Sequence, residues 1–374
     1  MKIIIAMDSF KGTLSANQAC EIVAQAIAEC VPSAEVVIKP MADGGEGTAQ
    51  AMIKAADGRW IPQRVMGPLP DMQVEAGFAW FDSDKTALVE MASASGLELL
   101  SREEMNPLKT TTYGTGQLIK AALDYGAQKI LLAVGGSATV DCGLGAAMAF
   151  GWEFLDSDGN PVPLGGEALE RVAKIIEPEK LKLVPVEVLC DVENPLCGEH
   201  GAARVYGPQK GATPEMVEQL EKGLMHLAVL VQEQLARDIN NVPGAGAAGG
   251  LAAGALAFMN AGLVSGIETV MTRSSLSKEL QSADWIITGE GSFDRQSLYG
   301  KVVSGIANLA LKSDARLGVI AGEVSVPEKE YQKLGIAAAV GCRTKGMSLD
   351  YALANPRELL HSASQHFAKE YLGS

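Results

Sequence analysis

The stretch Pro40-Met41-Ala42-Asp43-Gly44-Gly45-Glu46-Gly47-Thr48 places three glycines and two carboxylates directly after a short apolar run. Glycine allows positive φ angles and lets a ligand approach the backbone closely. Carboxylate oxygens in such a loop suit Mg²⁺ or a hydroxyl group. Taken alone, the loop is equally compatible with a glycine turn that carries solvated acids.

Similar polar or glycine-rich segments follow other apolar runs of the chain. They are Gly135-Gly136-Ser137-Ala138-Thr139, Cys190-Asp191 and Thr288-Gly289-Glu290-Gly291-Ser292-Phe293-Asp294. In open α/β sheets, ligands bind where the carboxyl ends of the strands meet. The recurrence therefore predicts one site at the edge of an α/β sheet.

Length and composition favour a soluble enzyme with two domains. The chain has 374 residues, of which 47% are hydrophobic and 20% are charged. Its net charge of -14 disfavours nucleic acid and anionic membranes as partners. An anionic substrate would need local cations. Basic residues in or beside glycine-containing segments, each with a solvated surface charge as the alternative, are Lys11, Arg204, Lys210, Arg295 and Lys301.

The cysteines and the amino terminus favour a cytoplasmic protein. Six cysteines without a C-x-x-C pair, and only four histidines, give no zinc pattern and suit reduced thiols. Met1–Asp8 is expected to form a strand rather than a signal peptide. Residues 239–267 carry no charge, but they are rich in glycine and alanine. We expect a tightly packed internal helix there rather than a membrane span.

The order of the expected elements predicts a discontinuous domain. Strands at 3–7 and 36–39 flank an amphipathic helix near 15–30, with Ser15 as its expected cap, and this order favours a βαβ unit and a parallel sheet. The same alternation resumes after residue 282. Its expected strands are 285–288, 317–320 and 337–341, and its expected helices are 301–311, 327–333 and 356–371. We therefore predict an α/β fold: a parallel-sheet domain from 1–62 and 282–374, with a mixed α/β domain at 63–281 inserted.

The middle of the chain has a different pattern. Short runs at 60–65, 73–80 and 87–91 are spaced as in antiparallel hairpins. Further expected elements are a helix at 115–125, a strand at 130–134, a helix at 143–151, a hairpin at 152–164 and a strand at 186–190. Thr213-Pro214-Glu215 predicts the start of a helix that runs to about Ile239.

Gly244-Ala245-Gly246-Ala247-Ala248-Gly249 fits the G-x-G-x-x-G fingerprint of dinucleotide sites, but an expected helix rather than a strand precedes it. A nicotinamide-dependent oxidoreductase would use these glycines. Packing against a neighbouring segment and a phosphate site at a helix start are the two alternatives. The sequence contains no P-loop motif, no protein-kinase catalytic loop and no G-x-S-x-G.

The remaining polar residues suit phosphoryl transfer, which needs a metal ion, a phosphate cradle, cations and a base for the acceptor hydroxyl. Carboxylates that can bind Mg²⁺ or accept a proton are Asp8, Asp43, Glu46, Asp191, Glu290 and Asp294. Residues that can hold negative groups are Ser9, Lys11, Lys210 and Lys301.

Several of these segments together resemble the bacterial type-1 glycerate kinase family. They are Asp8–Gly12, Pro40–Thr48, Gly114–Gly116, Gly135–Thr139, Cys190–Leu196, Tyr206–Ala212, Gly244–Gly250 and Thr288–Asp294 with Gly300-Lys301. The resemblance implies that the parallel-sheet domain is Rossmann-like, with the second domain inserted in it. It also implies phosphorylation of D-glycerate with ATP and Mg²⁺, and 2-phosphoglycerate as the product. Two departures affect loop shape: Met7 stands where the family usually has proline, and Val140 and Cys142 stand where asparagine and glycine are expected.

The resemblance also implies roles for single residues. The glycerate carboxylate is expected at Lys11 and Ser9, with Lys210 and Arg295 as further candidates. The expected catalytic residues are Asp191, as the base, and Lys11; a turn cap beside Asn194-Pro195 is the alternative role of Asp191.

The expected ligands of the nucleotide and of the metal come from several loops. The nucleotide candidates are Gly135, Gly136, Ser137, Gly289, Gly291 and Lys301, and the Mg²⁺ candidates are Asp43, Glu46 and Glu290. The alternative products are 3-phosphoglycerate or the phosphate of a related hydroxy acid, and the non-enzymatic alternative is an ATP- or acid-binding regulator. D-glycerate and ATP are the expected partners of a monomer or homodimer.

Overall fold

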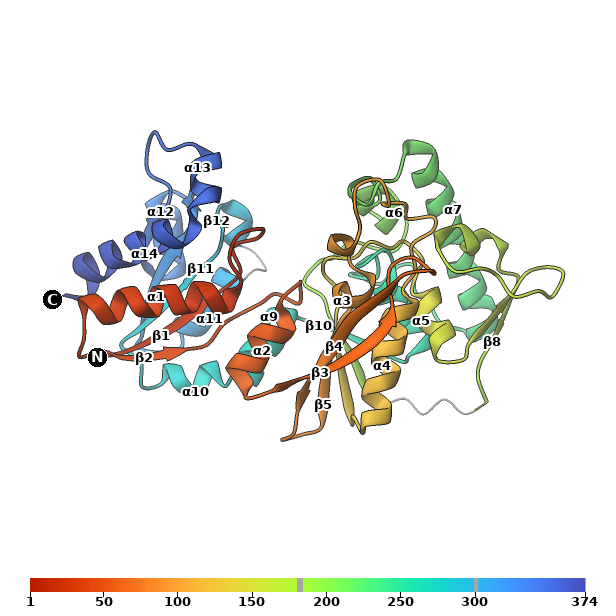
Figure 1. Cartoon of the computed structure of the whole chain (residues 1–374), viewed down its shortest axis with the longest axis horizontal. Helices are drawn as coiled ribbons and strands as arrows, with labels where there is room; N and C mark the ends of the chain where they lie inside the picture. The colour runs from red at the N-terminus through yellow and green to blue at the C-terminus, as the bar shows by residue number, and fades with distance from the viewer. Residues whose placement is uncertain (180–183, 299–301, 374) are drawn as a thin grey trace. The chain divides into compact units, whose positions relative to one another are not determined.

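The computed structural model describes residues 1–179, 184–298 and 302–373 (Figure 1). Its contacts divide the chain into two compact units, described separately below. Unit 1 comprises Met1–Asp43, Gln50–Gly58 and Gly266–Ser374, and unit 2 comprises Gly44–Ala49 and Arg59–Ser265. The unit limits at Gly58 and Gly266 differ from the expected domain boundaries near 62 and 282. That these units are domains stays a prediction.

Unit 1 contains a five-stranded sheet in the order β15-β13-β11-β1-β2, and all neighbouring strands are parallel. Its strands are β1 (Lys2–Met7), β2 (Glu35–Ile38), β11 (Trp285–Gly289), β13 (Arg316–Ala321) and β15 (Ile336–Gly341). Every residue from Ile3 to Met7 is fully buried, as expected for a parallel strand that is covered on both faces. The predicted Rossmann-like parallel sheet is confirmed.

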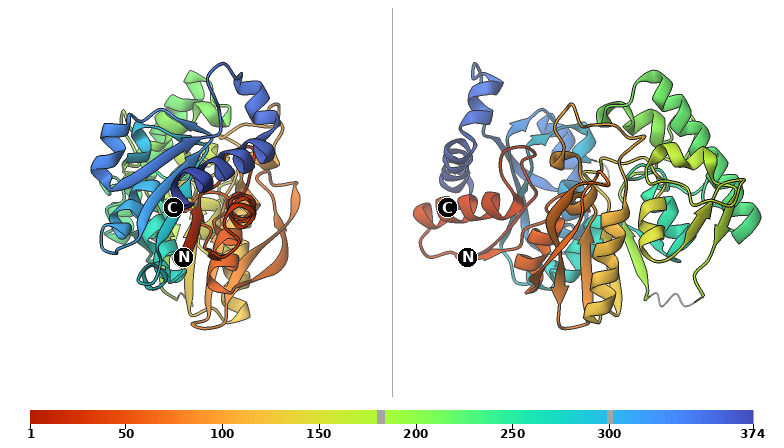
Figure 2. Two further views of the ribbon diagram at one scale, coloured as in Figure 1. Left: turned by 90° about the vertical axis from the view of Figure 1, so that its left-hand side faces the viewer. Right: turned by 45° about the vertical axis from the view of Figure 1, so that its right-hand side comes forward.

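Two helices from opposite ends of the chain pack side by side in unit 1 (Figures 1 and 2). They are α1 (Ala16–Cys30) and α14 (Pro356–Phe367). The predicted cap of α1 is confirmed, because the Ser15 hydroxyl accepts a hydrogen bond from the Gln18 backbone in a capping box. The remaining helices and short strands are α2 (Thr48–Ala56, which begins in unit 2), α9 (Gly266–Arg273), α10 (Leu276–Leu280), β12 (Ser292–Phe293), α11 (Val302–Ala310), β14 (Glu323–Val324), α12 (Glu328–Tyr331) and α13 (Leu349–Ala354).

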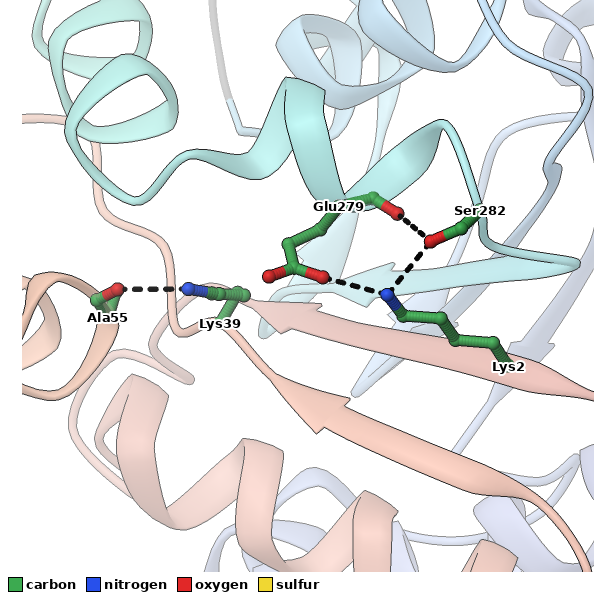
Figure 3. A network of polar contacts seen from close by, with 5 residues as sticks. All are labelled: Lys2, Lys39, Ala55, Glu279 and Ser282. Carbon is green, nitrogen blue, oxygen red and sulfur yellow. Dashed lines mark hydrogen bonds and ion pairs between the residues drawn. The ribbon is translucent and has the colours of Figure 1, made fainter.

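Polar contacts tie the amino end of β1 to α10 (Figure 3). The Lys2 ammonium donates hydrogen bonds to the Glu279 carboxylate at 2.8 Å and to the Ser282 hydroxyl at 2.9 Å. In the same view, the Lys39 ammonium donates to the Ala55 carbonyl near the end of α2. These contacts lie at the amino end of β1, and Asp8 follows the opposite, carboxyl end of the strand.

Unit 2 contains a six-stranded mixed sheet in the order β10-β9-β6-β5-β4-β3. Its strands are β3 (Arg59–Met66), β4 (Gln73–Phe81), β5 (Thr86–Glu90), β6 (Lys129–Ala133), β9 (Val186–Leu189) and β10 (Gly262–Val264). β3, β4 and β5 pair antiparallel, and β5, β6, β9 and β10 pair parallel. The predicted antiparallel hairpins and the predicted mixed α/β character of this part of the chain are both confirmed.

The remaining elements of unit 2 cover this sheet or form a small second sheet. They are α3 (Ala92–Ser95), α4 (Tyr113–Tyr125), α5 (Leu144–Ala149), β7 (Glu153–Leu155), β8 (Lys174–Ile176), α6 (Ala202–Tyr206), α7 (Pro214–Leu235) and α8 (Leu251–Phe258). Thr213 caps α7 as predicted, but the helix ends at Leu235 rather than near Ile239 because Ala236 adopts a left-handed conformation. β7 pairs with β8, whereas the expected hairpin at 152–164 is reduced to a bridge between Leu155 and Pro161.

The uncharged segment is helical over a much shorter length than we predicted. Leu251–Phe258 forms a helix, and α9 begins at Gly266 near the end of the segment. The glycines before Leu251 lie in turns, with positive φ at Gly244, Gly249 and Gly250. A Cβ at Gly249 would overlap the Thr139 carbonyl oxygen. The glycines therefore allow two backbone segments to pack closely. This favours the packing role of the motif over a dinucleotide site or a phosphate site. No helix in the described part of the chain is long and apolar enough to cross a membrane.

Candidate active site

A cavity of about 340 Å³ opens in unit 1 where the parallel strands end. Polar side chains that follow β1, β11, β13 and β15 contribute to its lining. They include Asp8, Ser9, Lys11, Glu290, Asp294, Glu323 and Arg343, and Asp43 from the segment after β2 joins them. This position is the carboxyl edge of an open parallel sheet, where the recurring sequence segments predict a site.

The register of β1 and β11 brings two carboxylates of this cavity together. Met7 and Gly289 are paired at the ends of the two strands, and the Asp8 backbone amide donates to the Gly289 carbonyl at 2.9 Å. Asp8 and Glu290, the next residues along the chain, therefore leave the sheet at neighbouring points. Both residues are buried, with 7% of each exposed.

Asp8 is a cavity carboxylate with a strongly shifted pKa. Burial, followed by the negative charge of Asp43, raises the pKa of Asp8 to about 7, and Glu290 adds to the shift. A hydrogen bond from the Ser9 amide, at 2.7 Å, and the charge of Lys11 act in the opposite direction. An aspartate in this state can exchange a proton near neutral pH, and it would be stabilised as an anion by a nearby cation.

The charge of the cavity lining suits a cation that binds few protein atoms and takes its other ligands from water or a substrate. Among the described residues that line the cavity there are five carboxylates and two basic residues, Lys11 and Arg343. Among the residues that the structure describes, however, no three His, Cys, Asp or Glu side chains are arranged to hold a metal ion. A cation here would take few protein oxygens and complete its shell with water or with oxygens of a ligand.

The same cavity has an apolar part, which comes from helices rather than from strand ends. Leu349, Ala352 and Leu353 of α13 contribute to it, together with Pro356 and Leu359 of α14. Leu349 and Leu353 are 54% and 51% exposed. The sequence patterns that led us to the strand ends contain no signal for this wall.

In unit 2, the loop that begins at Gly44 packs against the loop that follows β6. The Gly135 amide donates to the Gly44 carbonyl at 3.3 Å, and a Cβ at Gly135 would overlap Gly45. A Cβ at Gly44 would meet Leu189, the last residue of β9. Glycines are required here because two backbone segments approach each other.

Glu90 ends β5 at the same edge and was missed by the sequence analysis. It is 8% exposed, and its carboxylate accepts a hydrogen bond from the Ala49 amide at 2.6 Å, in the first turn of α2. Burial raises the pKa of Glu90 to about 7 despite this hydrogen bond. The signal was present in the sequence, because Glu90 is a carboxylate directly after an apolar run.

Lys210, a predicted substrate ligand, lies beneath the predicted nucleotide loop. Its ammonium donates to the Ser137 hydroxyl and to the Thr139 carbonyl, both at 2.7 Å, and only 2% of the residue is exposed. Burial lowers the pKa of Lys210 to about 7, and the negative charge of Asp141 partly offsets this effect.

Asp141 is the second buried charge of this cluster, and the sequence analysis missed it as well. It is fully buried and accepts hydrogen bonds from the Thr112 amide at 2.8 Å, the Thr112 hydroxyl at 2.9 Å and the Gly143 amide at 3.1 Å. Burial nevertheless raises its pKa. Lys210 and Asp141 thus belong to a network that holds the 135–143 segment in place.

Asp191, the predicted base, follows β9 at this edge of unit 2. Its carboxylate accepts a hydrogen bond from the Ser265 hydroxyl at 2.8 Å, directly after β10, and it is only half-buried. Its neighbour Asn194 makes its own contacts, with the His200 carbonyl and the Tyr206 hydroxyl. The bond from Ser265 orients the carboxylate between two strand ends.

The structure divides the predicted site residues between the units. The unit 1 cavity contains Ser9, Lys11, Asp43, Glu290 and Gly291. Unit 2 contains Glu46, Gly135, Gly136, Ser137, Asp191 and Lys210. Burial and the neighbouring Glu98 raise the pKa of Glu46.

Three predicted residues lie elsewhere. Gly289 is in β11, where a Cβ would overlap the Ile320 carbonyl oxygen. Arg295 is exposed and pairs with Glu330 at 3.2 Å, outside the residues that line the unit 1 cavity. Lys301 lies outside the described residues.

Comparison with known proteins identifies the family. A model of the glycerate kinase family matches residues 3–372. The glycerate 2-kinase of Escherichia coli K12 is 42% identical over 372 residues, which span 98% of this chain and 97% of that protein. The glycerate kinase of Halalkalibacterium halodurans is 42% identical over 370 residues, with the same coverage of 98% and 97%.

A crystal structure of a proposed glycerate kinase 2 from Salmonella typhimurium LT2 has a TM-score of 0.87 to this structure. It is 40% identical in sequence, and the match covers 100% of this chain and 98% of that one. The family and the enzyme class predicted from the sequence segments are confirmed. The chain belongs to the glycerate kinase family.

Proposed function

We propose that this protein transfers the γ-phosphoryl group of ATP to the 2-hydroxyl group of D-glycerate and forms 2-phosphoglycerate. The observation that carries the proposal is the cavity at the carboxyl ends of the unit 1 strands, with Asp8, Asp43 and Glu290 beside Lys11. The name of the Escherichia coli relative, a glycerate 2-kinase, supports the choice of the 2-hydroxyl over the 3-hydroxyl.

Mg²⁺ fits the chemistry of this cavity. It binds oxygen ligands and, in kinase sites, commonly takes one or two carboxylates together with phosphate oxygens and water. Asp43 and Glu290 are the residues that would hold it in unit 1, and Glu46 is the candidate in unit 2. When bound, Mg²⁺ neutralises phosphate charge that the carboxylates of the cavity would otherwise repel.

The acceptor needs a cation for its carboxylate and a base for its hydroxyl. Lys11 is exposed at the cavity and carries the only ammonium group among the described residues that line it, with the Ser9 hydroxyl nearby in sequence. We assign both to the glycerate carboxylate. Asp191 is our candidate for the base, because Ser265 orients it and leaves it accessible. We assign Lys210 an indirect role, in which its hydrogen bonds to Ser137 and Thr139 position the 135–139 loop.

The cysteines favour a cytoplasmic location for the enzyme. All six cysteines are free thiols, which suits a reducing compartment such as the cytoplasm. The expected partners are the small molecules D-glycerate and ATP, and the enzyme would act as a monomer or a homodimer.

The decisive experiment is incubation of the full chain with ATP, Mg²⁺ and D-glycerate, followed by NMR of the product. Coupling between phosphorus and the proton on carbon 2 is expected. Coupling to the protons on carbon 3 would replace the proposed product by 3-phosphoglycerate. ATP consumption with a different hydroxy acid only would reassign the substrate, and binding without turnover would contradict the kinase assignment.

A further inference from the structure

We propose that the apolar wall of the unit 1 cavity binds the purine base of the nucleotide. The wall consists of Leu349, Ala352 and Leu353 of α13 with Pro356 and Leu359 of α14. This inference rests on the proposed kinase function, because it assumes that one substrate is a nucleotide. It adds a subsite that the glycine and carboxylate segments of the sequence did not indicate.

The chemistry of the two substrates decides which of them the wall can serve. Glycerate has three carbons, each of which carries oxygen, so it presents no apolar face. A purine is a flat, largely apolar group joined through ribose to an anionic chain. A cavity with apolar helices on one part of its lining and strand-end charges on another matches the nucleotide and not the acid. Its volume of about 340 Å³ lies within the range of small-molecule sites.

The spacing and the exposure of the wall residues also indicate a ligand. Leu349 and Leu353 are four positions apart, and Ala352 is three after Leu349, so the three side chains share one face of α13. Both leucines expose about half of their surface, at 54% and 51%. Clustered exposed apolar side chains at the rim of a cavity typically mark a binding site, because they gain free energy when a ligand covers them.

The wall is held in place before any ligand binds. The Arg343 guanidinium donates to the Glu323 carboxylate and to the Met347 carbonyl, both at 3.0 Å. It therefore ties the segment between β15 and α13 to the strand end of β14. Ser348 then caps α13, accepting a hydrogen bond from the Tyr351 amide at 3.2 Å. A preorganised wall binds a flat base with little loss of conformational freedom.

This arrangement also orients the nucleotide. With the base against α13 and α14, the phosphate chain extends toward the strand ends, where Lys11, Asp43 and Glu290 line the same cavity. Gly291, a predicted nucleotide residue, is part of that lining. The reacting phosphate is thereby placed among the groups that we assign to Mg²⁺ and to the acceptor.

The test compares Leu353→Gln with Leu311→Gln in the full chain. Leu311 is a matched control because it is also an exposed leucine of unit 1, at 63%, and does not line the cavity. Calorimetry measures the affinity for Mg·ADP and for Mg·tripolyphosphate, a probe that has the phosphates without the base. We expect Leu353→Gln to weaken Mg·ADP binding about tenfold, with tripolyphosphate binding unchanged. Leu311→Gln should change neither affinity, and Leu353→Met should restore the affinity for Mg·ADP.

The other outcomes separate the inference from the proposed function. Unchanged Mg·ADP affinity in Leu353→Gln, or equal weakening of both probes, would overturn the inference. A higher KM for D-glycerate with unchanged Mg·ADP affinity would assign the wall to the acceptor and would also overturn it. If Leu353→Gln selectively weakens Mg·ADP binding but the wild-type protein does not phosphorylate glycerate, the base subsite stands and the proposed function fails. If Leu353→Gln does not fold, Ala352→Trp, which fills the cavity, must show the same selective loss of Mg·ADP.

Discussion

Strand ends of the two units carry similar sequence segments but use them differently. In unit 1, Asp8 and Glu290 follow β1 and β11 and line an open cavity. In unit 2, Lys210 and Asp141 sit beneath the loop after β6, fully enclosed and bonded to neighbouring backbone and hydroxyl groups. A glycine or polar turn after an apolar strand thus marks the edge of a sheet, and the surrounding packing decides whether its charges meet a ligand or support the loop.

Asp141 and Asp8 also differ in the groups that stabilise or oppose their negative charges. Asp141 has several hydrogen-bond donors that offset part of the cost of its burial. Asp8 has its neighbour Ser9 as a donor and two carboxylates, Asp43 and Glu290, that oppose its charge. A buried charge with many donors is typical of a structural network, whereas a carboxylate held beside like charges is typical of a functional site.

The largest effect is expected from Asp191→Asn. This variant tests whether unit 2 contributes a catalytic residue in addition to buried charges that support its loops. Asparagine keeps the shape but cannot accept the proton of the acceptor hydroxyl at neutral pH. We expect turnover to fall by about 10²–10⁴-fold, nearer the lower limit because positioning and the metal dominate phosphoryl transfer. Steady-state kinetics measures kcat and both KM values, which should change little. Activity restored by excess Mg²⁺ would instead make Asp191 a metal ligand.

Lys11→Ala tests the cationic part of the unit 1 cavity. Loss of a charged hydrogen bond of roughly 1.5–3 kcal/mol should raise the KM for D-glycerate about ten- to a hundredfold, with a smaller change for ATP. Lys312→Ala is the matched control, because that lysine is exposed and lies outside the residues that line the cavity. Its KM values should change less than about threefold. A larger change for ATP than for glycerate in Lys11→Ala would move Lys11 to the nucleotide.

Asp141→Asn and Asp8→Asn test the energetic contrast directly. In Asp141→Asn, the amide cannot accept every hydrogen bond that the carboxylate accepts, so the free energy of unfolding should fall by roughly 1–3 kcal/mol. In Asp8→Asn, the substitution removes a charge that burial and Asp43 disfavour, so the free energy of unfolding should be unchanged or higher. Urea denaturation at slightly alkaline pH measures both. A comparable loss in Asp8→Asn would show that Asp8 is structural, and the contrast would fail.

The smallest effect is a pH dependence that Lys210→Met should remove. Burial lowers the pKa of folded Lys210 to about 7 from its ordinary value of 10.5. Above pH 7 the unfolded state therefore retains a proton that the folded state has lost, so stability rises with pH. The slope attributable to this group is at most about 1.4 kcal/mol per pH unit, and below pH 7 it vanishes. Urea denaturation between about pH 6 and 9 should show this rise in the wild type relative to Lys210→Met. Parallel curves would mean that folded Lys210 keeps its proton throughout.

Local sequence patterns were sufficient for much of the fold. The apolar run at Ile3–Met7, the cap at Ser15 and the start at Thr213-Pro214 predicted β1, α1 and the beginning of α7. The motifs together predicted the family. The predicted length of the uncharged helix was wrong. The conformation of the glycines before Leu251 is set by contacts with distant backbone, such as Thr139, and not by helix periodicity.

The sequence by itself determined which residues stand at strand ends, because hydrophobic periodicity and turn residues report local backbone geometry. Only the tertiary structure decided which of those residues share a cavity and which are enclosed. Lys210 and Ser137 are 73 positions apart, and nothing local to either predicts that the ammonium would be buried against that hydroxyl. Likewise, α13 adds an apolar wall to a cavity whose acids come from strands at both ends of the chain. Burial and neighbouring charge are properties of contacts between distant segments, and those contacts exist only after the chain has folded.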